Sequence, residues 1–170
     1  IEIVHAAKRA GADAIKLQTY TANTITLNCN TEDFQVSEGP WLNHHTLWSL
    51  YNQSQTPWEW HEEIFFEARR IGLEVFSSPF DETAVDFLEK LDVTAYKIAS
   101  PEITHLPLLE RIAKTRKPVI LSTGIADLQD IECALKTLRD AGAKNLIVLK
   151  CTTSYPTPPE DSNLLTISDI

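Results

Sequence analysis

The feature that most constrains the fold is a series of five short apolar runs separated by helical patterns. The runs cover residues 14–17, 73–76, 95–99, 119–121 and 146–149. Each is rich in aliphatic residues and too short for a helix, which is typical of strands buried in a parallel sheet. The last four begin at residues 73, 95, 119 and 146, a spacing close to one strand–helix unit. The chain is therefore predicted to form repeated βα units.

The segments between these runs carry helix signals. Residues 56–71 are predicted to form a helix with Thr56 as N-cap, Pro57 at the first helical position and Glu59 completing a capping box. Gly72 is predicted to end it. Further helices are predicted within residues 1–11, 81–91 (with Asp81 as N-cap), 106–115 and 127–141, the last one ended by Gly142.

Chain length sets how much of a barrel these units can form. A complete (β/α)8 barrel needs about 250 residues, whereas this chain has 170. The prediction is an α/β fold, a partial TIM barrel with about strands 2–6 of eight. No GxGxxG motif follows any run, which disfavours a dinucleotide-binding sheet. Residues 20–55, rich in Asn, Thr, Trp and His, are predicted to form a covering loop or lid.

Composition excludes several function classes. A net charge of −9 disfavours nonspecific nucleic-acid binding, and no apolar stretch approaches the roughly 18 residues of a membrane span. The three cysteines have no zinc-site spacing, which indicates reduced thiols in a cytoplasmic protein. An acidic protein that binds an anionic metabolite must concentrate positive charge locally.

Such a concentration occurs where the predicted strands end. In barrels of parallel strands the chemistry lies at the carboxyl ends of the strands. Lys16, Lys97 and Lys150 lie near three of these ends, and all five ends carry a hydroxyl or amide side chain. Lysines that only extend into solvent are the alternative, but three of them favour a site for phosphate or carboxylate. Glu102 would either hold a lysine or a sugar, or act as an acid/base.

Other residues give weaker signals. Lys150 also suits a Schiff-base aldolase, because a desolvated lysine near other cations can be nucleophilic. The four tryptophans are interpreted as core and loop packing, with a sugar site as the alternative; they are Trp41, Trp48, Trp58 and Trp60.

Five motifs together resemble the sialic-acid-synthase family of nonulosonate synthases. In chain order they are KLQTY, SSPFDETAVDFLEKLDV, AYKIASPEITHLPLL, KPVILSTG and KCTTSYPTPPED, and the match runs in order across nearly the whole chain. The combination of YKIAS…E with KPVILSTG about 20 residues later is specific. The segments TPWEWHEE and KLQTYTANTITL are most similar to the pseudaminic branch of that family.

The resemblance implies a barrel transferase that joins phosphoenolpyruvate to an open-chain amino sugar and releases phosphate. For the pseudaminic branch the sugar is a 2,4-diacetamido-2,4,6-trideoxy hexose of altrose type. The family also implies a divalent metal (Mn²⁺ or Mg²⁺), a cytoplasmic place in carbohydrate biosynthesis and a homodimer when full length. It implies neither nucleic-acid nor membrane partners.

The family's site residues transfer by motif onto this chain. The phosphoenolpyruvate site would comprise Lys16, Ser78, Lys97, Ser100, Ser122 and Thr153. Tyr155 would face the sugar. Glu102 would be the catalytic residue near the reacting carbons, and it would also orient the sugar.

Parts of the family pattern have no counterpart in the 170 residues. These are the first strand, the two strands that bring the metal-binding histidines, and the C-terminal antifreeze-like (SAF) domain. The chain is thus expected to be an incomplete N-terminal barrel domain, residues 1–170, without metal ligands and inactive alone. Three alternatives stay open: an N-acetylneuraminate or legionaminate synthase, a Schiff-base aldolase using Lys150, and a non-catalytic sugar-acid binding protein.

Overall fold

The computed structural model shows a parallel sheet of five strands, and it describes residues 1–37, 41, 45–154 and 156–170. The strands are β1 (Ala14–Thr19), β2 (Glu74–Pro79), β3 (Tyr96–Ile98), β4 (Val119–Ser122) and β5 (Leu146–Leu149). They lie side by side in chain order, and every pairing is parallel. The predicted series of βα units is therefore confirmed, and the fold is a partial TIM barrel.

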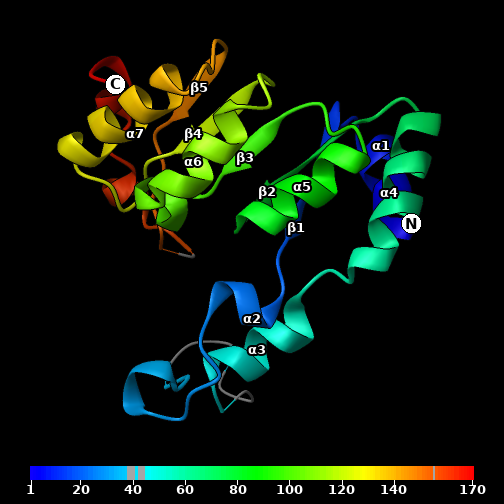
Figure 1. The fold of residues 1–170 in the computed structure, drawn as a ribbon, viewed down its shortest axis with the longest axis horizontal. Coiled ribbons are helices and arrows are strands. Elements are labelled where there is room, and N and C mark those ends of the chain that lie inside the picture. The colour runs from blue at the N-terminus through cyan, green and yellow to red at the C-terminus, as the bar shows by residue number, and fades with distance from the viewer. Residues whose placement is uncertain (38–40, 42–44, 155) are drawn as a thin grey trace.

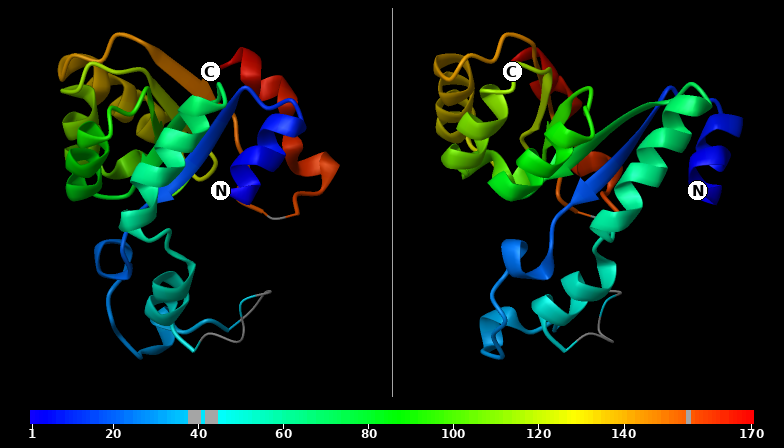
Figure 2. Two further views of the ribbon diagram at one scale, coloured as in Figure 1. Left: turned by 90° about the vertical axis from the view of Figure 1, so that its right-hand side faces the viewer. Right: turned by 45° about the vertical axis from the view of Figure 1, so that its right-hand side comes forward.

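Helices follow or precede each strand and pack on one side of the curved sheet (Figure 1, Figure 2). They are α1 (Glu2–Arg9), α4 (Trp58–Arg70), α5 (Glu82–Lys90), α6 (Leu106–Ala113) and α7 (Leu128–Asp140). Short 3₁₀ segments are η1 (Glu32–Phe34), η2 (Ser100–Thr104), η3 (Pro159–Ser162) and η4 (Leu164–Ser168). Because each crossover contains a helix, neighbouring strands run in the same direction.

The core lies between the sheet and this helix layer. Val75, Tyr96 and Leu121 from the strands are fully buried there, together with helix residues such as Phe65 and Leu109. Successive side chains of a strand point to opposite faces of the sheet. Lys16 of β1 and Lys97 of β3 directly precede the core residues Leu17 and Ile98. These two lysines therefore point to the face away from the helices.

The helix starts only partly match the sequence prediction. Asp81 caps α5, since its carboxylate accepts hydrogen bonds from the backbone N–H groups of Thr83 (2.8 Å) and Ala84 (3.2 Å). The predicted Thr56 cap is wrong, because α4 begins at Trp58 after an extended Pro57 and has no side-chain cap. The start of α4 is instead held by tertiary contacts of the Trp58 indole with Tyr20 and Phe87.

The described residues between positions 20 and 55 form an arm that projects beyond the carboxyl end of β1 (Figure 1, Figure 2). The arm contains two helices that sequence patterns did not predict, α2 (Ala22–Ile25) and α3 (Leu47–Ser54). Both are short and begin after a threonine; Thr46 accepts a hydrogen bond from the Ser49 N–H at 3.1 Å. The arm contributes one wall of the cavity at the strand ends, as described below.

Candidate functional site

A cavity of about 420 Å³ lies at the carboxyl ends of the strands. All five strands or the segments that directly follow them contribute to its lining. The six residues predicted for phosphoenolpyruvate all line it: Lys16 (β1), Ser78 (β2), Lys97 (β3), Ser100 (η2), Ser122 (β4) and Thr153 (after β5). Residues spread over 138 positions of sequence, from 16 to 153, therefore meet in one place.

A hydrogen-bond network connects the polar groups of β3, β4 and the segment after β5. The Lys97 ammonium donates to Ser122 Oγ and to the carbonyl oxygen of Ile98 (3.0 Å). The Cys151 thiol lies 3.3 Å from the same serine oxygen and donates to it. Because Ser122 Oγ accepts from both neighbours, its own proton is free to donate to a ligand in the cavity.

The two lysines of the cavity are electrostatically unusual. Burial lowers the pKa of Lys16 and of Lys97. The pKa of Lys97 is raised in part by Cys151, lowered by the Lys16 charge and raised by Glu102. Among the described residues, neither lysine forms a salt bridge. Two partly buried ammonium groups without a bound carboxylate favour an anionic ligand.

A close backbone approach holds the serine of η2 in place. The Gly124 N–H donates to Ser100 Oγ at 3.0 Å. A Cβ atom at Gly124 would lie 2.9 Å from that oxygen and 3.0 Å from Cγ2 of Thr153. The site thus needs a residue without a side chain at this position, since two cavity residues occupy the space.

Glu102 lies in η2, next to the cavity but not among the residues that line it. Its Oε2 is buried and has no hydrogen-bond partner among the described residues. Burial raises the pKa of this carboxyl, while its own backbone N–H and the Lys97 charge lower it. A carboxyl with a raised pKa and an unpaired oxygen is suited to proton transfer. The other predicted sugar contact, Tyr155, lies outside the described residues.

Aromatic residues line the other side of the cavity, and the sequence prediction missed them. Tyr20, Tyr51 and Phe80 are all lining residues. The Tyr20 ring packs edge-on against Tyr51 and Phe80, with centroid distances of 5.8 and 5.3 Å. Tyr20 and Phe80 directly follow strands, so their position gave a signal. Tyr51 lies on α3, and no sequence pattern placed it here.

Lys150, the alternative Schiff-base residue, has a different position. It does not line the cavity, and its ammonium group donates to the carbonyl oxygen of Cys151 at 3.3 Å. The lysines that do line the cavity come from β1 and β3.

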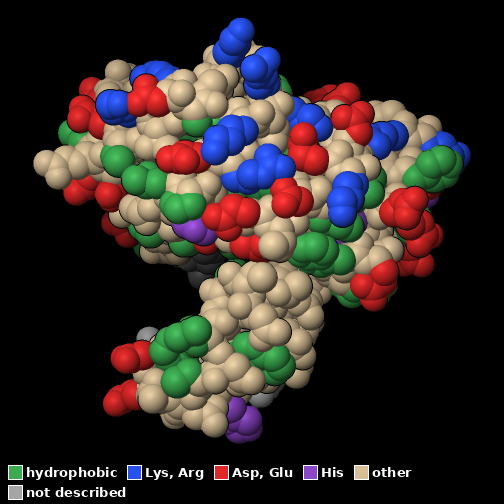
Figure 3. Space-filling view, in the orientation of Figure 1, with side chains coloured by type: hydrophobic (Ala, Val, Ile, Leu, Met, Phe, Trp, Pro, Cys, Tyr) green, Lys and Arg blue, Asp and Glu red, His purple; other side chains and the backbone are tan. Residues whose placement is uncertain are grey.

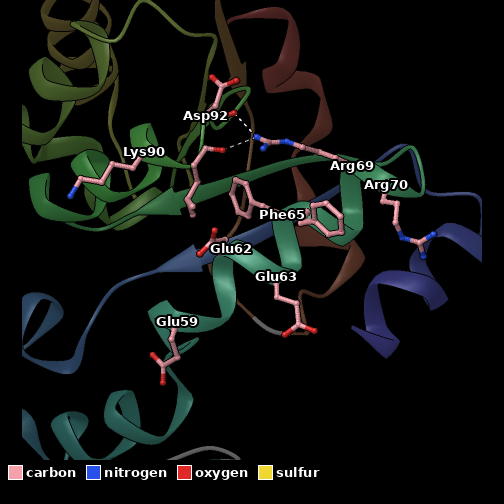
Figure 4. Close-up of a pocket in the computed structure, with 10 residues that line it drawn as sticks. Glu59, Glu62, Glu63, Phe65, Arg69, Arg70, Lys90 and Asp92 are labelled. Carbon is pink, nitrogen blue, oxygen red and sulfur yellow. Dashed lines mark hydrogen bonds between the residues drawn. The ribbon is translucent and has the colours of Figure 1, made fainter.

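A larger cavity of about 890 Å³ lies on the outer side of α4, near the end of α5 (Figure 4). Arg69 closes one side by donating to the carbonyl oxygens of Leu91 (2.8 Å) and Asp92 (2.5 Å). The other labelled charges, such as Glu63 and Arg70, point in different directions. The face in Figure 3 also shows acidic and basic side chains interspersed over the helix layer. Polar side chains from several strands converge at the strand ends in the described part of the chain, so we place the candidate site there.

Other features bear on metal, membrane and redox chemistry. In residues 1–37, 41, 45–154 and 156–170, no three His, Cys, Asp or Glu side chains are grouped so as to hold a metal ion. No helix in this part of the chain is long and apolar enough to cross a membrane. Cys29, Cys133 and Cys151 are free thiols.

Comparison with known proteins gives this site a context. The NeuB family matches residues 3–170. The chain belongs to the NeuB family. The resemblance read from the five motifs is thereby confirmed.

Two curated relatives with high identity to this chain are pseudaminic acid synthases. The chain is 43% identical to pseudaminic acid synthase of Helicobacter pylori over 166 residues, which is 98% of this chain and 48% of that protein. It is 44% identical to pseudaminic acid synthase of Campylobacter jejuni over 164 residues, which is 96% of this chain and 48% of that protein. The chain spans about half the length of these curated relatives.

A solved NeuB-type structure confirms the fold. The N-acetylneuraminic acid synthetase of Leptospira borgpetersenii, crystallised with citrate, superposes with a TM-score of 0.82 at 27% identity. The superposition covers 99% of this chain and 53% of the other.

Proposed function

We propose that this chain forms the phosphoenolpyruvate-binding part of a synthase that makes pseudaminic acid. The enzyme would condense phosphoenolpyruvate with a 2,4-diacetamido-2,4,6-trideoxy hexose of altrose type and release phosphate. One observation carries the proposal: the six residues expected to hold phosphoenolpyruvate line a single cavity at the strand ends. The similarity to two pseudaminic acid synthases supports the branch.

The cavity chemistry fits a small trianion. Lys16 and Lys97 supply the positive charge, and the serine hydroxyls supply donors at fixed positions. Ser122 in particular has its proton available, because Lys97 and Cys151 occupy its acceptor positions. Charge-assisted hydrogen bonds to phosphate and carboxylate are about twice as strong as neutral ones.

The proposed reaction forms one carbon–carbon bond and replaces the C2–O bond to phosphate with a C2–O bond from water. C3 of phosphoenolpyruvate attacks the aldehyde carbon of the open-chain sugar, and the aldehyde oxygen takes a proton to become a hydroxyl. Water adds its oxygen to C2 of the former enolpyruvate. The C2–O bond to phosphate then breaks, leaving inorganic phosphate and the 2-keto acid. Glu102, whose pKa is raised by burial, would deliver or accept a proton beside Lys97.

Further parts of the proposal concern the protein that contains this chain. A divalent metal would supply polarisation of the sugar aldehyde. The described residues offer no cluster to bind it, so no step here depends on it. We place the enzyme in the cytoplasm, acting as a homodimer whose subunit also includes an antifreeze-like domain. Residues 1–170 alone are proposed to be inactive, and turnover by this chain alone would contradict that.

The test measures phosphoenolpyruvate affinity of the protein expressed from the complete gene, by titration calorimetry. Lys97→Met should weaken binding at least tenfold, because a hydrogen bond to a charged group contributes about 1.5–3 kcal/mol. Lys136→Met is the matched control, since it removes the same charge from an exposed residue of α7 that pairs with Asp140. Equal affinity of the Lys97 variant and the control would contradict the proposed site.

A second measurement separates the sugar branches. Phosphate release is followed with the diacetamido altrose, with N-acetylmannosamine and with the corresponding diacetamido mannose. Release only with the first supports the pseudaminic branch. Release with either of the others keeps the family and rejects the branch. Phosphoenolpyruvate binding without release in any of the three would favour a non-catalytic sugar-acid binding protein.

A further inference from the structure

The two ends of the arm within residues 20–55 meet at its base. The backbone N–H of Ala22 donates to the side-chain oxygen of Gln55 (3.3 Å), so the two ends of the arm meet. The indole N–H of Trp48 on α3 donates to Asn23 Oδ1 on α2 (2.8 Å). These contacts hold α2 and α3 together next to the strand ends.

The arm has a cavity of its own, of about 640 Å³. Gln18, Tyr20 and Tyr51 line this arm cavity and also line the cavity with the lysines. The two cavities therefore share a wall, and the arm cavity opens beside the anion site. A ligand larger than phosphoenolpyruvate could reach from one to the other past these three side chains.

The lining of the arm cavity differs sharply from that of the anion site. Trp41, Leu47 and Leu50 provide apolar surface, while Gln18 and Gln35 provide amides. None of the described residues that line it carries a charge. Such a lining matches a neutral ligand that has methyl groups and hydrogen-bonding oxygens and nitrogens.

Exposure of the tryptophans points to the same cavity. Trp58 stacks on Phe87 at 4.6 Å between centroids and donates to the carbonyl oxygen of Tyr20 (3.2 Å), so it has a packing role. Trp48 joins the two arm helices. Trp41 lines the arm cavity with 55% of its surface exposed. A large aromatic surface left open in a cavity is available for a ligand.

We infer that the arm cavity binds the neutral, N-acetylated part of the sugar substrate, with Trp41 as its aromatic contact. This inference rests on the proposed function and adds a specificity site to it. The acetamido methyl and deoxy methyl groups would pack on Trp41 and Leu50, and the side-chain amides would bind the acetamido groups. The aldehyde end of the sugar would extend past Tyr51 toward the anion site.

The test uses phosphate release by the protein from the complete gene. The diacetamido altrose is varied at saturating phosphoenolpyruvate, and phosphoenolpyruvate is then varied at saturating sugar. Trp41→Ala should raise the KM for this sugar about tenfold and change the KM for phosphoenolpyruvate less than twofold. Trp41→Phe should restore most of the affinity, because an aromatic face is kept. Leu50→Ala should act in the same direction through the same cavity.

Trp60→Ala is the matched control, since Trp60 is 57% exposed on α4 and lines neither of these two cavities. An unchanged sugar KM in Trp41→Ala, or an equal rise in Trp60→Ala, would overturn the inference. A parallel rise in both KM values would also overturn it, because it would indicate a general structural effect. Failure of the wild type to bind phosphoenolpyruvate would overturn the proposed function, and this inference with it.

Discussion

Gly124→Ala tests whether close packing around the serine of η2 creates the anion site. The added Cβ would lie 2.9 Å from Ser100 Oγ and 3.0 Å from Thr153 Cγ2. Neither neighbour is the end of a long flexible side chain, and Ser100 is only 9% exposed. At least one of the two cavity residues must therefore move.

Two costs follow from this displacement. Overpacking of this kind lowers the free energy of unfolding by about 1–3 kcal/mol. Moving Ser100 also breaks its 3.0 Å hydrogen bond from the Gly124 N–H and takes its hydroxyl away from the ligand. A lost hydrogen bond to a charged group costs about 1.5–3 kcal/mol, so phosphoenolpyruvate affinity should fall about 10- to 100-fold.

The assay is calorimetric titration of phosphoenolpyruvate into wild type and variant, with chemical denaturation run alongside. Gly142→Ala is the control, because Gly142 has φ +107° and no atom within 4 Å of an added Cβ. It should destabilise the fold through backbone strain and leave affinity unchanged. The double variant Gly124→Ala/Thr153→Ser should recover part of the lost stability, because it removes Thr153 Cγ2, which the added Cβ would crowd. Wild-type affinity in Gly124→Ala would refute this reasoning.

Two further predictions concern stability. His61 is fully buried, with Nε2 2.9 Å from Thr19 Oγ1, and burial lowers its pKa. Since the unfolded chain binds the proton more readily, His61 stabilises the fold above about pH 6.5. That stability is lost as the pH falls toward the lowered pKa. His61→Gln should flatten this acid limb in denaturation curves recorded from pH 7.5 to 5, and an unchanged slope would contradict the assignment. Asp81→Ala should lower the free energy of unfolding by about 1 kcal/mol through loss of the α5 cap. The free energy of unfolding is measured by chemical denaturation for this variant and for Glu132→Ala, an exposed change within α7 that serves as the control. Equal values for the two variants would show that the cap is unimportant.

Much of the site was predictable because its information is local in sequence. Short apolar runs located the strands, Lys16 and Lys97 lie near the ends of two of them, and the ends of parallel strands meet at a common edge. The serines follow the same strands, so the strand assignments brought these groups to one edge, although Lys150, which follows β5, does not line the cavity. Motif similarity added which ligand such a cavity holds in the NeuB family.

The start of α5 was predictable because a side chain makes its cap. Asp81 accepts N–H groups two and three residues ahead, a purely local bond that the sequence shows. The start of α4 depends instead on Trp58, whose indole contacts Tyr20 and Phe87. Those partners lie tens of residues away, so the local capping pattern at Thr56 gave the wrong boundary.

The sequence by itself determined the order of the βα units, the parallel sheet and the set of polar groups at its carboxyl edge. Tertiary structure alone decided which residues of the arm lie opposite these polar groups. Tyr51 reaches the cavity because α3 folds back on α2, and His61 joins Thr19 across 42 positions of sequence. Spacing and periodicity describe contacts within one element, whereas these contacts depend on how separate elements pack.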